Sequence, residues 1–207
     1  MKAHQLKILL PFLDLPFVKV LLEECSLMDV AKGEEVIKQN GFTPGVPIVL
    51  EGLIKVSIQN DDRSLLLYYI QPGQSCVMSF SSCLKGSPSK IFATTVENTK
   101  ILLVPIEKLE IWLKQHPSFN TLFYSQYETR YADLLGNIQQ LLFHNIDQRL
   151  FEYLKNKKAL SPNKAIKITH KQIAHDLGTA REVISRTLKK LEKDGQITQT
   201  QLGINLR

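Results

Sequence analysis

The segment from Ile168 to Glu192 constrains the fold more than any other part of the chain. It contains two helix starts with the capping-box pattern, in which an N-cap hydroxyl and a side chain three residues later satisfy unpaired backbone N–H groups reciprocally. Gly178 lies between the two starts and allows a tight turn. The segment therefore predicts two short helices that cross steeply, a helix-turn-helix. The two capping pairs are Thr169 with Gln172 and Thr179 with Glu182.

The second of these helices, over residues 180–192, is predicted to read DNA. An inward stripe of Ile184, Leu188 and Leu191 leaves a second face rich in polar and charged groups. On such a face Arg can pair with guanine, Glu can accept from cytosine and Ser can meet a thymine edge in the major groove. An ordinary solvated face is the alternative, which the paired helix starts and the local positive charge disfavour. The candidate DNA-binding residues are Thr169, His170, Thr179, Arg181, Glu182, Ser185, Arg186, Lys189 and Lys190.

The excess positive charge of the chain lies in its last third. From Asn145 to the end there are 13 Lys and Arg against 6 Asp and Glu, or +7, which leaves −1 of the total +6 for everything before it. Neutralisation of phosphates supplies most non-specific affinity for nucleic acids, so a basic domain beside a near-neutral one favours double-stranded DNA as the partner. A merely lysine-rich surface is the alternative on charge alone.

A region of short β-favouring runs lies between Met28 and Val104. Turn residues separate the runs, and many short strands at this spacing are typical of an all-β sandwich or jelly roll. Before this region, a helix-like stretch over residues 6–22 is broken by Pro11 and Pro16. The predicted strands are 36–37, 48–50, 54–58, 65–70, 92–96 and 101–104.

From Pro117 the hydrophobic period changes to alternating steps of three and four, the pattern of a helix that pairs with another helix. We expect this helix to join two copies of the chain, and packing on the β domain of the same chain is the alternative. Gly136 lies within this row of apolar residues, which we call the seam, and would allow the two paired helices to approach closely. A hinge is predicted at residues 143–146, with Asn145 or Asp147 able to cap the next helix. The predicted dimer residues are Tyr124, Tyr127, Tyr131, Leu134, Ile138 and Leu141.

Several of these residues also match a known signature. Leu177-Gly178, the run from Arg181 to Arg186, Leu188, Leu191 and the run from Asp194 to Ile197 resemble the helix-turn-helix of the Crp/Fnr superfamily. The β region, long helix, hinge and C-terminal helices also follow that family's order along nearly the whole chain.

The resemblance implies an α+β fold in three parts. Residues 1–116 would form a cyclic-nucleotide-binding-like β jelly roll, 117–144 a dimerisation helix and hinge, and 145–207 a winged helix-turn-helix domain whose wing is 197–206. It further implies a bacterial transcription regulator, a homodimer that reads a palindrome with TGA-like half-sites. Glu182, Ser185 and Arg186 would read bases, with Arg181 on phosphate or base. RNA polymerase is a further candidate partner.

The resemblance weakens where family members bind a cyclic nucleotide. After the turn at Pro72-Gly73, the family's ribose-binding Glu is missing, and Lys90-Ile91 stands where the phosphate-binding Arg-Ser pair is expected. Lys lacks the planar fork that grips phosphate, and Ile donates nothing. These departures argue against cyclic AMP, although gating by a cyclic nucleotide, or by a redox or haem signal, is an alternative. The candidate effector-pocket residues are Gln74, Ser75, Cys76, Cys83 and Lys90.

The cysteines and histidines limit other chemistries. Cys25, Cys76 and Cys83 contain no CxxC pair, which argues against a structural zinc site, and three thiols are too few for an iron–sulfur cluster. Cys76 and Cys83 could form a redox pair or contact a haem or another ligand, and two small buried apolar residues are the alternative. His116 and His144 are the candidates for haem ligation.

A jelly-roll metal enzyme is the main alternative of another class. It needs clustered His and carboxylate ligands, and no histidine falls between Met28 and Val104. No G-x-S-x-G elbow or phosphate-binding loop occurs either. A regulatory domain that meets only protein partners would leave the basic face unexplained. We therefore expect no catalytic residues, metal or cofactor. No apolar run approaches the length of a membrane span, so we expect a cytoplasmic protein.

Overall fold

The computed structural model describes every residue except 1, 61–62, 144, 161, 163–164 and 207, and every side chain of the described residues except those of 60, 63 and 140–143. The chain forms two compact units. One comprises residues 1–59 and 67–133, and the other comprises residues 60–66 and 134–207. The long helix α5 (Pro117–Phe143) contributes residues to both. None of the helices in the described part of the chain is long and apolar enough to span a membrane.

Two short helices, α1 (Ala3–Leu9) and α2 (Leu15–Glu24), open the first unit. The side chain of Asp14 caps α2 and accepts a hydrogen bond of 2.7 Å from the backbone N–H of Phe17. Pro16 lies in the first turn, where its missing N–H costs nothing because the helix leaves that donor unpaired. The predicted helix-like stretch, interrupted at its prolines, is thus confirmed.

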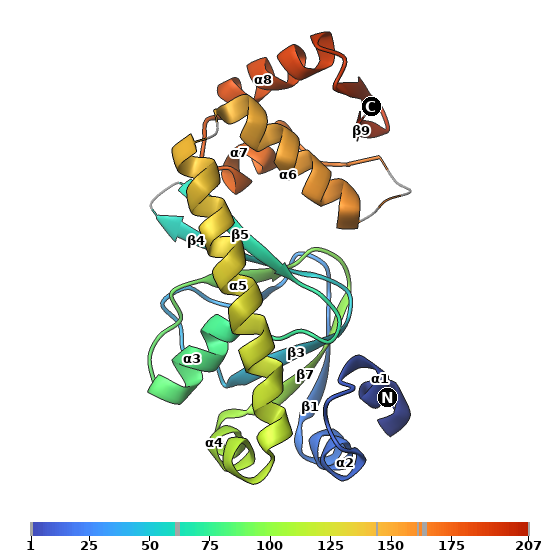
Figure 1. The fold of residues 1–207 in the computed structure, drawn as a ribbon, viewed down its shortest axis with the longest axis vertical. Coiled ribbons are helices and arrows are strands. Elements are labelled where there is room, and N and C mark those ends of the chain that lie inside the picture. Colours follow the sequence, from blue (N-terminus) through green and yellow to red (C-terminus); the bar gives the residue numbers. More distant parts are fainter. Residues whose placement is uncertain (1, 61–62, 144, 161, 163–164, 207) are drawn as a thin grey trace. The chain divides into compact units, whose positions relative to one another are not determined.

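Two antiparallel sheets follow, and the predicted strands are all present (Figure 1). One sheet has the order β1-β7-β3 and the other the order β2-β6-β4-β5. The strands are β1 (Ser26–Val30), β2 (Glu35–Ile37), β3 (Gly45–Glu51), β4 (Ile54–Asn60), β5 (Arg63–Ile70), β6 (Phe92–Thr95) and β7 (Thr99–Pro105). Only β1 was not expected from the sequence, because it is exposed along most of its length and lacks an apolar face.

Within the three-stranded sheet, β3 and β7 are buried on both faces. Side chains alternate along a strand, so Val49 and Ile101 join one cluster between the two sheets while Ile48 and Leu102 join another under the helices. The second cluster brings together α1, α2, α3 (Val77–Lys85), α4 (Ile106–Gln115) and the start of α5. This double burial explains why β3 and β7 are apolar almost throughout.

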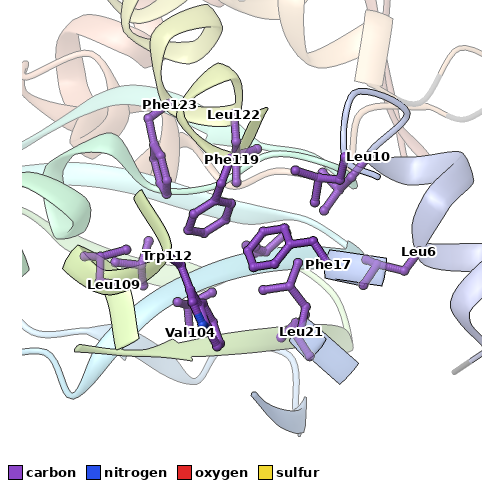
Figure 2. Packing of buried hydrophobic residues seen from close by; sticks show 14 of the residues in the cluster. Leu6, Leu10, Phe17, Leu21, Val104, Leu109, Trp112, Phe119, Leu122 and Phe123 are labelled. Atoms are coloured by element: carbon purple, nitrogen blue, oxygen red, sulfur yellow. The ribbon is translucent and has the colours of Figure 1, made fainter. Parts of the chain in front are cut away.

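Aromatic rings fill the cluster under the helices. Figure 2 shows Phe17, Trp112 and Phe119 within it, and the ring of Phe17 meets both others edge-on, at centroid distances of 5.6 and 5.3 Å. Phe123 of α5 stacks on Phe80 of α3 at 3.7 Å. These contacts fix the first part of α5 against the β domain of the same unit.

The second unit contains α6 (Ile146–Leu160), α7 (His170–Asp176), α8 (Arg181–Lys193) and the hairpin of β8 (Ile197–Thr200) and β9 (Gly203–Leu206). The side chain of Asn145 accepts from the backbone N–H of Gln148 at 3.0 Å, so the predicted cap of α6 is confirmed. The hairpin is the predicted wing. Gly203 has a φ of +131°, and a Cβ there would lie 2.6 Å from the carbonyl oxygen of Ile166, so only glycine fits.

The tip of the β4–β5 hairpin also belongs to the second unit. The Oγ atom of Ser64 lies 3.0 Å from Nδ1 of His175 on α7. Leu66 packs against the apolar cluster that α6, α7 and α8 build. This segment is far in sequence from the helices that it contacts, and the sequence pattern does not predict the contact.

Candidate nucleic-acid interface

The first predicted capping box is confirmed. The Oγ1 atom of Thr169 accepts from the backbone N–H of Gln172 at 3.2 Å, and Oε1 of Gln172 accepts from the backbone N–H of Thr169 at 3.0 Å. The two residues therefore satisfy each other's unpaired donors at the start of α7. The turn that follows is also as predicted, because Gly178 has a left-handed φ of +64°.

The second predicted capping box is wrong. The N-cap of α8 is Ala180, which has no side-chain cap, and Thr179 lies one residue before it. The backbone N–H of Thr179 donates to the carbonyl oxygen of Ala174 at 2.9 Å, which holds Thr179 in the turn and out of the cap position. Glu182 then lies in the first turn of α8 and is exposed. A negative charge there is favoured by the helix dipole, and the carboxylate is directed to solvent rather than to a cap.

α8 is strongly amphipathic, as the sequence predicts. Ile184 and Leu188 are fully buried and Leu191 nearly so, in the cluster shared with α6 and α7. The other side of the helix is polar, and we call it the reader face. It consists of Arg181, Glu182, Ser185, Arg186 and Lys189. All of these are exposed except Ser185, which is half-buried. The reader face therefore offers cations, a carboxylate and a hydroxyl from one rigid helix.

Several members of the predicted DNA-binding set have side-chain partners within the protein. Lys190 forms an ion pair with Oδ2 of Asp147 in the first turn of α6. The hydrogen bond and the charge of Asp147 raise the pKa of Lys190. His170, the first residue of α7, has Nδ1 2.9 Å from Oγ of Ser185. Lys190 is thus tied to α6, whereas Lys189 beside it is exposed toward solvent.

Contacts that no local pattern predicts hold the helix-turn-helix and the wing. Tyr153 of α6 donates from its hydroxyl to Oδ2 of the buried Asp176 at 2.7 Å. Glu192 at the end of α8 accepts from both the backbone and the side chain of Gln199, at 2.7 and 3.0 Å, and so fixes β8. These partners lie far apart in sequence or in different elements. In the sequence, each is a polar residue of a type that is common on protein surfaces, so its contact is not predicted.

A second surface lies on α5. The predicted seam residues with described side chains are all exposed, from 40% for Tyr127 to 71% for Tyr124, while Phe119, Leu122 and Phe123 form the buried face of the helix. Tyr127 also contacts α3 of its own unit: its hydroxyl donates to the carbonyl oxygen of Val77 at 3.4 Å, and its ring meets that of Phe80 edge-on at a centroid distance of 6.3 Å. Dimerisation through the seam stays a prediction. The side chain of Leu141 lies outside the described residues. Gly136 has open space around its Cβ position, and the exposed seam side chains form an apolar stripe along α5.

The predicted effector-pocket residues are only partly brought together. Gln74 accepts from Nη2 of Arg130 at 2.9 Å, and the guanidinium of Arg130 lies over the ring of Tyr68, 4.3 Å from its centroid. The Tyr68 hydroxyl in turn lies 3.8 Å from Sγ of Cys76, and burial raises the pKa of Tyr68 well above its ordinary value. Arg130 is the group that sequence reasoning missed, because it lies on α5, far from the strand region.

The remaining pocket candidates have other roles. The backbone N–H of Ser75 donates to Gln126 at 2.7 Å, Cys83 lies 3.7 Å from the Thr43 hydroxyl, and Lys90 is exposed. Cys76 caps α3 and Cys83 lies seven residues later on the same helix. At a rise of about 1.5 Å per residue their Cα atoms are roughly 10 Å apart, too far for a disulfide.

Only one of the two haem candidates lies within the described residues. His116 stacks on Phe17 with ring centroids 3.9 Å apart. His144 lies outside the described residues.

These features define a winged helix-turn-helix protein with a separate double-sheet β domain and a long helix between them in sequence. Residues 148–207 match the Crp-like helix-turn-helix domain. The chain thus carries a Crp-like helix-turn-helix domain, and its fold is the one seen in solved Crp/Fnr regulators, as the sequence resemblance implied.

Solved structures show the same fold over nearly the whole chain. A Crp/Fnr-family regulator from Eubacterium rectale ATCC 33656 is 23% identical, with a TM-score of 0.81 over 94% of this chain and 90% of that one. The c-di-GMP-responsive global regulator CLP of Xanthomonas campestris is 17% identical, with a TM-score of 0.83 over 93% and 99%.

Two curated proteins are also similar in sequence. The global nitrogen regulator of Synechocystis sp. PCC 6803 is 24% identical over 180 residues, which are 80% of this chain and 79% of that protein. The neuropathy target esterase sws of Drosophila ananassae is 25% identical over 147 residues, which are 68% of this chain but only 9% of that protein.

Proposed function

We propose that the protein regulates transcription by binding DNA as a homodimer through the reader face of α8. The observation that carries this proposal is the exposure of the reader face on a helix whose other side is buried, within the domain that matches the Crp-like helix-turn-helix. The N-terminal part of such a helix enters the major groove. A DNA-binding role would place the protein in the cytoplasm.

The chemistry of the reader face supports a G·C-containing half-site similar to TGA. Arg186 is exposed and can donate two parallel hydrogen bonds to guanine O6 and N7. Glu182, which is not used as a cap, can accept from cytosine N4. Arg181 and Lys189 supply positive charge for neighbouring phosphates.

The apolar stripe of α5 supports a dimer. Its exposed tyrosines and leucines would be covered by the same stripe of a second copy related by a two-fold axis. Two reader helices arranged in this way meet successive major grooves about 34 Å apart, so the bound site would be a palindrome. In this proposal residues 1–116 sense a signal, 117–144 join the copies and 145–207 bind DNA.

Cyclic AMP is not the signal in this proposal. The segment of Gln74 and Ser75 contains no carboxylate that could accept from a ribose hydroxyl. The guanidinium of Arg130 donates to the side chain of Gln74, so its partner is a residue of the protein. The chain is also proposed to have no catalytic activity. The match to the esterase covers so little of that enzyme that it does not argue for hydrolysis.

Selection of bound duplexes from a random pool tests the proposal, carried out with and without reductant. We expect enrichment of two inverted half-sites with centres about one helical turn apart. Recovery of unrelated sequences, or of none, would refute sequence-specific DNA binding. A site that is enriched only in the absence of reductant would show that a thiol controls binding.

A further inference from the structure

His170 and Ser185 connect the two helices of the helix-turn-helix at the reader face. The Nδ1 atom of His170 lies 2.9 Å from Oγ of Ser185, and both residues are half-buried. His170 is the first residue of α7, and its neighbour Thr169 already caps that helix. The imidazole is therefore not needed for capping, and its described partner is a residue that faces DNA in the proposed function.

A serine hydroxyl has one hydrogen and two lone pairs, so its bond to the imidazole determines what it can offer a base. If Nδ1 accepts, the Ser185 hydrogen is used, and the oxygen can only accept from adenine N6 or cytosine N4. If Nδ1 donates, Ser185 keeps its hydrogen for thymine O4 or for guanine O6 or N7. In the first case the ring holds the hydroxyl hydrogen and in the second it occupies one lone pair, so in both cases it restricts the orientations that the hydroxyl can adopt.

We propose that His170 is a positioning residue for base reading: it orients the Ser185 hydroxyl and thereby sets the preference at one base pair of each half-site. This inference rests on the proposed DNA-binding function. The geometry distinguishes His170 from the exposed cations of the reader face, because its Nδ1 bonds a reader side chain within the protein. A histidine that only contacted a phosphate would contribute equally to the affinity for every DNA sequence.

The test compares base preferences of the full-length protein and four variants, measured with duplexes that differ at single positions of the selected site. Ser185→Ala identifies the base pair that the hydroxyl reads. His170→Ala should reduce the preference at that same pair by about threefold to tenfold, the range for a single hydrogen bond. His170→Asn should retain most of it, because an Asn amide can reach the position of Nδ1. In the double variant His170→Ala/Ser185→Ala, the preference at that base pair should fall by the same factor as in Ser185→Ala alone.

The outcomes separate this inference from the proposed function. If the unmodified protein prefers no sequence, the proposed function itself fails. If it selects a site but His170→Ala weakens all duplexes equally, His170 is a phosphate contact and the inference is overturned. The inference is also overturned if Ser185→Ala changes no preference, or if the two single losses add in the double variant. Circular dichroism and affinity for a random duplex control for misfolding.

Discussion

The Nη2 atom of Arg149 donates a hydrogen bond of 2.7 Å to the carbonyl oxygen of Leu177, the C-cap residue of α7. Carbonyls at the end of a helix lack partners within the helix, and here a cation from α6 supplies one. Arg149 is half-buried, and this burial lowers the pKa of its guanidinium. The contact lies directly before the turn at Gly178, so it fixes where the reader helix begins.

Replacing Arg149 with Met should destabilise the helix-turn-helix by about 1.5–3 kcal/mol, because the change leaves the Leu177 carbonyl without its charged donor. Hydrogen exchange of the amides in α7 and α8 measures this loss directly. Arg149→Lys keeps a cation at this position and should recover part of the lost stability. Fluorescence of Trp112, which lies in the first unit, should be unchanged. Equal exchange rates in Arg149→Met and the unmodified protein would contradict the assigned role.

Two adjacent lysines should differ in their contribution to DNA binding. Lys189→Ala should weaken binding almost uniformly across sequences and reduce the slope of log affinity against log salt by about 1, as expected for a lost phosphate contact. Lys190→Ala should reduce the slope less, because Lys190 is paired with Asp147. Fluorescence anisotropy titrations at several salt concentrations measure both slopes. Asp147→Asn is the matched variant, and it should increase the slope by releasing Lys190.

Equal slopes for Lys189→Ala and Lys190→Ala would show that the ion pair with Asp147 does not hold in the DNA complex. An unchanged slope for Lys189→Ala would remove that residue from the phosphate contacts.

The fold was largely predictable because its signals are local and periodic. The pairing of Thr169 with Gln172 spans one helical turn, and the buried stripe of α8 repeats at helical spacing. The failure at Thr179 has a physical cause. The sequence pattern fits a cap, but the backbone hydrogen bond from Thr179 to Ala174 places the residue in the turn instead. A tertiary constraint thus overrides a local preference.

The missed parts of the candidate site depend on contacts between distant residues. Arg149 and Leu177, or Arg130 and Gln74, meet only when the helices and sheets are assembled. Helix α3 is not predicted for another reason: it is rich in serine, whose side chain competes with the helix by hydrogen-bonding to nearby backbone groups. No rule of sequence spacing links the members of the two distant pairs, so only the folded structure shows their contacts.

Charges on the apolar stripe of α5 should separate the proposed dimer. The double variant Leu134→Glu/Ile138→Glu would bring four carboxylates together at the seam, and burying unpaired charges costs several kcal/mol. Size-exclusion chromatography with light scattering should then give monomers. Thr129→Glu introduces a charge at an exposed position off the seam and should leave the dimer intact. A dimeric double variant would place the interface elsewhere.

Cys25 should react slowly with thiol reagents in the folded protein. Burial, with a smaller contribution from the negative charge of Glu24, raises the pKa of Cys25 to about 12. At pH 8 only about one thiol in ten thousand would then be the reactive thiolate, and the fraction should grow as the pH rises toward 12. Mass spectrometry after brief iodoacetamide treatment measures the labelling of each cysteine. Labelling of Cys25 as fast in the native protein as in urea would contradict its burial.

The base-reading role of Arg186 is the centre of the proposed function, and repeating the random-pool selection with Arg186→Ala tests it most directly. The variant should bind its former site about 1–3 kcal/mol more weakly and lose its preference for guanine at one position of each half-site, with the other positions unchanged. If Arg186→Ala and the unmodified protein select sites with the same preference at every position, the reader face of α8 does not read DNA as proposed.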